Sequence, residues 1–96
     1  MSDKKICMLA CHEVGYEILK YLLENGIRIN YLVTLSPEQA IQYNVSGYFD
    51  LSLISAEYNI PIYYPEMYSL NSNKDIEFFA TNHFDLLIIG GWQRLI

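Results

Sequence analysis

A change in the spacing of apolar residues divides residues 6–27, ICMLACHEVGYEILKYLLENGI, into two parts. The run from Lys5 to Ala10 is apolar, too brief for a helix and followed by polar residues, so it predicts a buried strand. From Glu13 the apolar residues recur at helical spacing, acids stand in the first turn where the helix dipole favours them, and Asn25 and Gly26 supply a stop. A buried strand leading into an amphipathic helix begins a β-α-β unit.

The same alternation continues along the chain. We expect strands over residues 27–34, 62–64 and 84–90. Between them we expect a loop over 35–47 with a short helical turn at 37–42, and a helix over 50–59 capped by Asp50. A last helix is expected from Ser72 or Asn73, with Ile76, Phe79 and Ala80 facing the sheet. Strands that alternate with helices predict an α/β fold with one parallel sheet and right-handed crossovers.

The common doubly wound strand order 3-2-1-4 would make the first and fourth strands neighbours, with their carboxyl ends beside the crevice where such folds bind ligands. We therefore expect Cys11, His12 and Glu13 on one lip of the crevice and residues 91–96 on the other. The loop from Tyr43 to Asp50, rich in Tyr and Asn, is expected near the substrate side.

Composition limits the classes of function. The chain has 96 residues, of which 52% are hydrophobic, and a net charge of -5, so we expect one cytoplasmic domain that does not bind nucleic acid. The longest apolar stretch, 84–92, is shorter than the ~20 residues of a membrane span. The amino-terminal residues do not have the pattern of a secretion signal. Cys7 and Cys11 stand too close in sequence for a useful disulfide.

The fourth strand predicts a missing neighbour. Residues 86–89 are apolar on both faces, as expected of a strand that is covered above and below and flanked on both sides. An apolar edge strand promotes aggregation, so the chain is predicted to be the front half of a longer domain or to pair with another chain. The alternative is an edge covered by residues 91–96.

The cysteine and histidine residues give only weak indications of catalysis or metal binding. Cys11 beside His12 suggests a thiolate nucleophile, but neighbours at a strand end should point in opposite directions, which favours a buried thiol at Cys7 and a loop residue at Cys11. His12 and His83 lack further ligands at metal-binding spacing, so no metal is expected.

The glycines exclude one cofactor class and leave two roles open. CHEVG is not G-x-G-x-x-G, which disfavours ordinary dinucleotide binding and makes Gly15 a helix-packing glycine or a point of close backbone approach. Gly90 and Gly91 either form a turn or let a flat ligand approach the main chain, with Trp92 as an aromatic wall.

Four stretches of the chain resemble the amino-terminal part of formyltransferases that use 10-formyltetrahydrofolate. They are ICMLACHEVGYEILKYLLENGI, LSPEQAIQYNVSGYFDLS, AEYNIPIYYPEMYSL and FDLLIIGGWQRLI, and together they span essentially the whole chain. The chain looks most like sugar N-formyltransferases that act on nucleotide-linked amino sugars, and more distantly like methionyl-tRNA formyltransferase. The most specific piece is GGWQRLI after an apolar strand.

The resemblance implies a Rossmann-like domain over residues 1–96, an incomplete half of the formyltransferase domain that stops before the catalytic motif. It also implies that the loop after the fourth strand contacts the pterin of the folate, largely through backbone atoms. Carried over to this chain, that loop is Trp92, Gln93, Arg94, Leu95 and Ile96.

The family's catalytic Asn, His and Asp follow this loop, so no residue of the chain matches them and no catalytic residue is assigned. His12 and His83 precede the motif. The resemblance thus implies a piece of a formyltransferase that is inactive alone, and the acidic composition favours a nucleotide-sugar substrate over tRNA. The alternative is a noncatalytic α/β binding or assembly module that pairs through its fourth strand, as a homo-oligomer or with a missing half.

Overall fold

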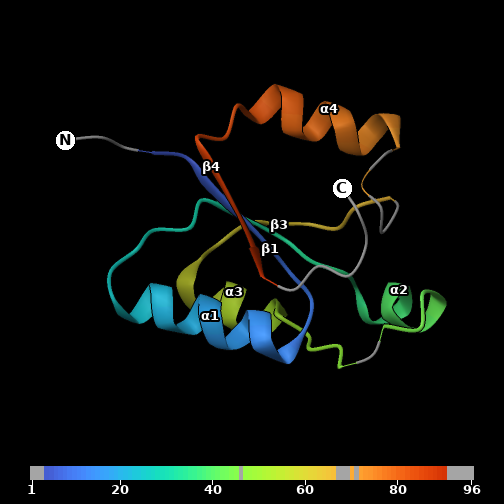
Figure 1. Ribbon diagram of the computed structural model, residues 1–96, viewed down its shortest axis with the longest axis horizontal. Coiled ribbons are helices and arrows are strands. Elements are labelled where there is room, and N and C mark those ends of the chain that lie inside the picture. Colours follow the sequence, from blue (N-terminus) through green and yellow to red (C-terminus); the bar gives the residue numbers. More distant parts are fainter. Residues whose placement is uncertain (1–3, 46, 67–69, 71, 91–96) are drawn as a thin grey trace.

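The computed structural model describes residues 4–45, 47–66, 70 and 72–90. Its elements are, in chain order, β1 (Ile6–Ala10), α1 (Glu13–Glu24), β2 (Tyr31–Val33), α2 (Pro37–Gln42), α3 (Ser52–Tyr58), β3 (Ile62–Tyr63), α4 (Asn73–Asn82) and β4 (Leu86–Gly90) (Figure 1). The strands form one parallel sheet in the order β3-β2-β1-β4, which confirms the predicted fold class and strand order.

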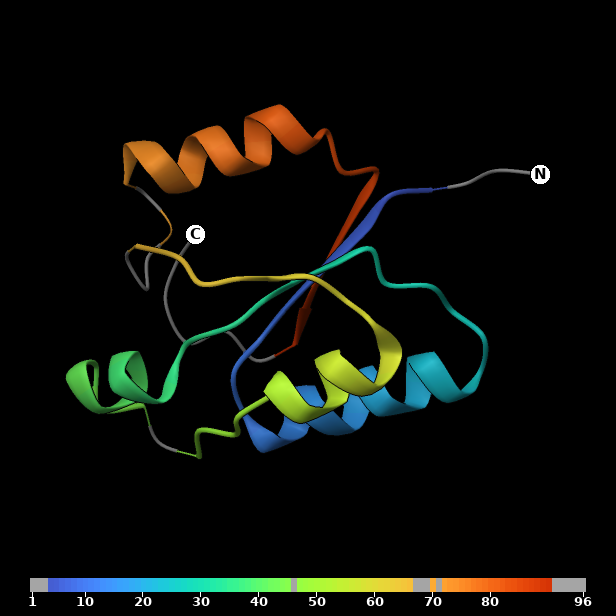
Figure 2. The same cartoon turned by 180° about the vertical axis from the view of Figure 1, so that it is seen from behind.

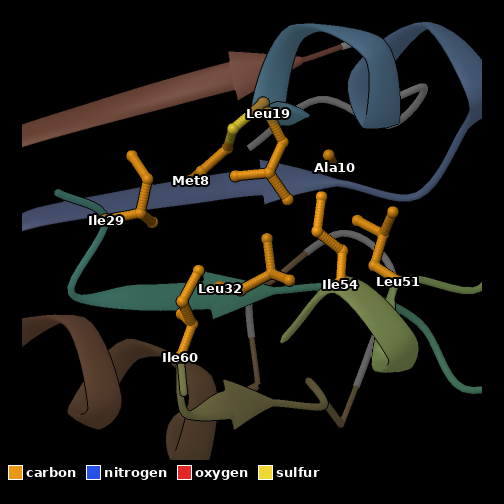
Figure 3. Packing of buried hydrophobic residues seen from close by; sticks show 8 residues of the cluster. All are labelled: Met8, Ala10, Leu19, Ile29, Leu32, Leu51, Ile54 and Ile60. Carbon is orange, nitrogen blue, oxygen red and sulfur yellow. The ribbon is translucent and has the colours of Figure 1, made fainter. Parts of the chain in front are cut away.

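Helices cover the two faces of the sheet. Figures 1 and 2 show α1 and α3 together on one face and α4 on the other. On the first face Met8 and Leu32 pack with Leu19 of α1 and Ile54 of α3 (Figure 3). On the second face, the alternate strand residues Cys7, Leu9 and Val33 form a core. Phe78 and Phe79 of α4 pack against this core. None of the helices within the described ranges has the length and apolar content needed to cross a bilayer.

The second strand is shorter than predicted. Asn30 hydrogen-bonds to both backbone groups of Ile6. The Oδ1 of Asn30 accepts from the N–H of Ile6 (2.8 Å), and the N–H of Asn30 donates to the carbonyl of Ile6 (2.8 Å). Regular pairing between β1 and β2 starts only after that, at Cys7 with Tyr31. Residues 27–30 therefore connect α1 to the sheet instead of extending the strand.

Local capping sets where the helices begin. Ser36 and Gln39 form a reciprocal capping box with Pro37 in the first turn, so the predicted turn at 37–42 is the helix α2. The prediction that Asp50 caps α3 is wrong, because the N-cap is Leu51. The carboxylate of Asp50 instead accepts the N–H of Ser52 at 2.9 Å, which is a turn hydrogen bond just before the helix.

The inner face of α4 agrees with the prediction at Phe79, which packs against the core, and differs from it at the other positions. Ser72 caps the helix as expected, but Ile76 and Ala80 are exposed, and Asp75 is fully buried. The carboxylate of Asp75 accepts hydrogen bonds from the hydroxyl of Tyr63 (2.6 Å) and the N–H of Glu66 (2.9 Å). These bonds compensate for the burial of the carboxylate, and they turn the helix so that Asp75 faces the sheet in place of an aliphatic residue.

Strand β4 lies at the edge of the sheet. Within the described part of the chain it pairs only with β1, and its Leu86, Leu87 and Ile89 are about half exposed. The described residues thus leave one edge of an entirely apolar strand without a neighbouring strand.

Two glycines allow α1 to pass over the end of β4. A Cβ on Gly15 would lie 2.6 Å from the carbonyl oxygen of Gly90 and 2.6 Å from Cβ of Ala10. A Cβ on Gly90 would lie 3.0 Å from Cε of Met8 and 3.3 Å from Cα of Gly15. Both roles predicted for Gly15 are therefore confirmed, because it packs α1 against the sheet by close backbone approach. Gly90 is the last strand residue and packs against the helix, so it is not in a turn.

We expect Gly15→Ala to lower the free energy of unfolding in urea by about 1–3 kcal/mol, because the added methyl group must displace backbone on both sides. This loss would occur despite the higher helix propensity of alanine. Val14→Ala, at an exposed position on the same turn, should change stability by less than about 0.5 kcal/mol. A Gly15→Ala protein as stable as the original would contradict the close approach.

Candidate functional site

The predicted crevice lies where β1 and β4 end side by side. Ala10 and Gly90 are register partners at the last positions of the two strands. Cys11, His12 and Glu13 continue from β1 into α1, as expected for the first lip. The residues of the second lip, Gly91 and the proposed folate contacts Trp92, Gln93, Arg94, Leu95 and Ile96, lie outside the described residues.

A segment from the loop before α3 covers the first lip. Residues 47–49 run antiparallel to 11–13, with a bridge between His12 and Tyr48, a hydrogen bond from the Glu13 N–H to the Gly47 carbonyl (3.2 Å) and one from the Phe49 N–H to the Cys11 carbonyl (3.0 Å). Phe49 also stacks on Tyr16 of α1, with ring centroids 4.4 Å apart. The loop expected near the substrate side therefore lies on the carboxyl edge of the sheet.

His12 is buried there, and one of its ring nitrogens has no hydrogen-bond partner in the described part of the chain. Its side chain is 8% exposed, and as N-cap of α1 it makes no capping hydrogen bond through the side chain. Nδ1 lies 3.7 Å from Sγ of Cys11, while Nε2 is buried and finds no hydrogen-bond partner among the described residues. A neutral imidazole can offer this nitrogen as a donor or an acceptor, depending on its tautomer.

The contact between Cys11 and His12 corrects one prediction. The two side chains were expected to point in opposite directions, but Nδ1 of His12 lies 3.7 Å from Sγ of Cys11, because His12 is already the N-cap of α1. Cys11 follows β1 in the short connection to α1, as predicted, but it is fully buried in the core on the α4 face. Cys7 and Cys11 are not joined by a disulfide.

Thr34 places a second polar atom of this kind at the same edge. It directly follows β2, its side chain is 1% exposed, and Oγ1 finds no hydrogen-bond partner within the described ranges. Buried polar atoms are nearly always hydrogen-bonded, so each exception calls for an explanation such as a bound water or a ligand. Two exceptions at the carboxyl ends of neighbouring strands make this edge the candidate polar site. Sequence patterns give no signal for either one, because both depend on tertiary burial.

Tyrosines and acids surround the covering segment. The hydroxyl of Tyr48 donates to the Leu35 carbonyl at 2.7 Å, and burial, with the nearby charge of Asp50, raises the pKa of Tyr48 to about 12. Burial and the charges of Asp50 and Glu38 also raise the pKa of Tyr64. The tyrosines are therefore neutral hydrogen-bonding groups at physiological pH, and two carboxylates give this region a negative potential.

A hollow of about 540 Å³ opens beside this segment, between α2 and Tyr48. It is lined mainly by apolar side chains and contains Pro37, Ala40, Ile41, Asn44, Val45 and Tyr48. A separate apolar cavity of about 280 Å³ lies under α4 beside β4, lined by Leu9, Leu70, Ile76, Phe79, Leu87 and Ile89. The first hollow adjoins the candidate polar site, whereas the second adjoins the free edge of β4.

Other candidate residues lie elsewhere. His83 caps the carboxyl end of α4, and nearby Asn82 accepts a hydrogen bond from the Lys5 ammonium group at the amino end of the sheet, so His83 is not brought to the site. Burial raises the pKa of the Cys7 thiol to about 12, which keeps it protonated and unreactive. Within the described ranges, His, Cys, Asp and Glu side chains form no group of three that could hold a metal ion.

Comparisons with known proteins add no relative. No protein-family model matches the chain, and no curated protein matches it significantly. Fold and site geometry therefore establish an α/β protein with a parallel sheet and a polar, partly covered carboxyl edge.

Replacing Thr34 by Val keeps the shape of the side chain and removes the unpartnered hydroxyl. We expect Thr34→Val to raise the free energy of unfolding in urea by about 1 kcal/mol, since an unpaired buried polar group is destabilising. Thr81→Val, at an exposed position on α4, is the matched control and should have little effect. If Thr34→Val destabilises the protein while the control does not, Oγ1 of Thr34 has a hydrogen-bond partner in the folded protein, and the prediction is wrong.

The raised pKa of Tyr48 predicts a loss of stability at alkaline pH. The folded state holds the phenolic proton more tightly than the unfolded chain, so this contribution is present below about pH 10 and is lost as the pH rises toward 12. Burial also raises the pKa of Tyr63 and of Tyr64, and these residues add to the decline.

Tyr48→Phe should therefore make the decline in unfolding free energy between pH 10 and 12 shallower than in the original protein. At neutral pH the same change removes the hydrogen bond to Leu35 and should cost about 1 kcal/mol. Tyr21→Phe, on the exposed face of α1, is the control. Equal alkaline slopes for Tyr48→Phe and the original would refute the assignment.

Proposed function

We propose that this chain is the amino-terminal, Rossmann-like part of a formyltransferase that moves a formyl group from 10-formyltetrahydrofolate to an amino group of a nucleotide-linked amino sugar. The observation that carries the proposal is the stretch GGWQRLI directly after an apolar strand. In support, β4 ends at Gly90 beside Ala10, so the chain leaves the sheet at the carboxyl edge, where parallel α/β folds bind ligands.

The surroundings of the site suit an amine acceptor. Glu38 and Asp50 give the region around Tyr48 a negative potential, which attracts an ammonium group more than a phosphate-rich polymer such as tRNA. In the proposed reaction the amine nitrogen bonds to the formyl carbon, the bond from that carbon to N10 of the folate breaks, the amine loses a proton and N10 gains one.

We assign no catalytic residue within this chain. The family's Asn, His and Asp follow the folate loop, and no residue here matches them, so the chain would contribute part of the folate site and would not transfer a formyl group alone. The edge of β4 that has no neighbouring strand among the described residues is where the remaining strands of such a domain would add.

Calorimetric titration with 5-formyltetrahydrofolate tests the proposal. We expect binding by the chain, or by a longer chain that includes the next βα unit of about 30 residues, and an affinity at least about tenfold weaker in Trp92→Ala and Arg94→Ala. His83→Ala, away from the crevice, should bind like the original. If neither length of chain binds, or if the two loop variants bind as tightly as the original, the folate proposal is wrong.

The second candidate is a noncatalytic assembly module that pairs through β4. The observation in its favour is the half-exposed Leu86, Leu87 and Ile89 on a strand whose outer edge is open among the described residues. It becomes the better reading if folate does not bind either chain.

A further inference from the structure

We propose that two copies of this chain pair through the free edges of their β4 strands, antiparallel about Ile88, to form one continuous sheet. The inference rests on the assembly role named above and concerns the 96-residue chain by itself, because the further strands of a longer formyltransferase domain would occupy the same edge. Its starting point is a strand, Leu86–Gly90, that has apolar side chains on both faces and one partner strand among the described residues.

The backbone N–H and C=O groups of β4 point in the directions that such pairing requires. The N–H of Leu86 points toward β1, where it contacts the carbonyl of Lys5 at 3.4 Å. Backbone groups alternate in direction along a strand, so Leu86, Ile88 and Gly90 face β1, whereas Leu87 and Ile89 direct their N–H and C=O groups to the free edge. With Ile88 at the two-fold axis, Leu87 lies opposite Ile89 of the second copy, and these residues exchange hydrogen bonds in both directions.

The side chains are complementary to themselves in this register. Leu87 and Ile89 lie on the α4 face, where both line the apolar cavity of about 280 Å³ together with Leu9 and Phe79. Antiparallel pairing sets Leu87 beside Ile89 of the second copy and Ile89 beside Leu87 of the second copy, so the two cavities meet across the axis. Cross-strand aliphatic pairs of this kind stabilise sheets.

The charge pattern favours this surface for self-association. Each copy carries a net charge of -5, which makes most approaches between copies repulsive, but residues 86–90 contain no charged side chain. Edge strands of monomeric proteins are usually protected by a lysine, a proline or a bulge, and β4 has neither of these residues and keeps an unbroken register with β1. A strand without charged side chains, which sets aliphatic Leu87 opposite aliphatic Ile89 about Ile88, fits a second copy of itself.

Light scattering after gel filtration of the 96-residue chain gives the first test. We expect a dimer at tens of micromolar, and an association at least about tenfold weaker in Leu87→Lys and Ile89→Lys, because each places a charged side chain opposite an aliphatic one beside the two-fold axis. The matched control is Leu53→Lys, which changes an 83% exposed leucine on α3 and should leave the dimer intact. Circular dichroism checks that each variant is folded.

A monomer at all accessible concentrations, or open-ended aggregates that persist in both β4 variants, would overturn the inference. A dimer that survives both variants would refute the pairing but leave the assembly role standing. Binding of a strand from another protein to β4 with no self-association would likewise refute it. None of these outcomes bears on the folate titration.

Oxidative cross-linking tests the register. In the proposed pairing the two Ile88 residues form a pair without backbone hydrogen bonds, with Cα atoms about 4.5 Å apart, so Ile88→Cys should form a disulfide-linked dimer. Leu86→Cys is the control, because its two copies would lie about 13 Å apart along the strands, beyond disulfide reach. Cys7 and Cys11 are fully buried and should not compete. Efficient cross-linking through Leu86→Cys instead would contradict the register.

Discussion

The structure depends on a central strand that has neither a free edge nor a free face. Between β2 and β4, and between the helices of both faces, the residues from Cys7 to Cys11 are all at most 1% exposed. Such a strand can contain only apolar or small side chains, and its backbone must hydrogen-bond on both sides. The positions of α1, β2 and β4 follow from this requirement, and so does the place where the chain leaves the sheet toward the candidate site.

The sequence predicts this part of the fold well because the spacing of apolar residues along the chain matches the faces that are buried in the folded protein. The run from Lys5 to Ala10 and the stop at Asn25 and Gly26 agree with the observed β1 and α1, and the strand order is the common doubly wound one that was expected. The errors occur where side chains compete for backbone groups. Asn30 shortens β2 by bonding to Ile6, and Asp75 turns α4 because its carboxylate finds partners inside the protein. Neither partner can be read from spacing along the chain.

The candidate site illustrates a second limit. The sequence predicts His12 at the carboxyl end of β1, but spacing along the chain does not indicate that His12 is buried, that it contacts Cys11, or that Thr34 has another polar atom without a partner among the described residues. These features arise because residues 47–49 pair across the end of β1. A site that buries polar atoms without partners among the described residues lowers stability, and proteins retain such arrangements mainly where a ligand or water completes them.

Placing the folate at this edge can be examined residue by residue by two-dimensional amide NMR of the 96-residue chain during addition of 5-formyltetrahydrofolate. The account predicts that the largest shifts fall on the amides of His12, Gly15 and Gly90, at the carboxyl ends of β1 and β4. Amides at the opposite edge, such as those of Asn30 and Asp85, should stay in place. Shifts confined to that opposite edge would contradict the account.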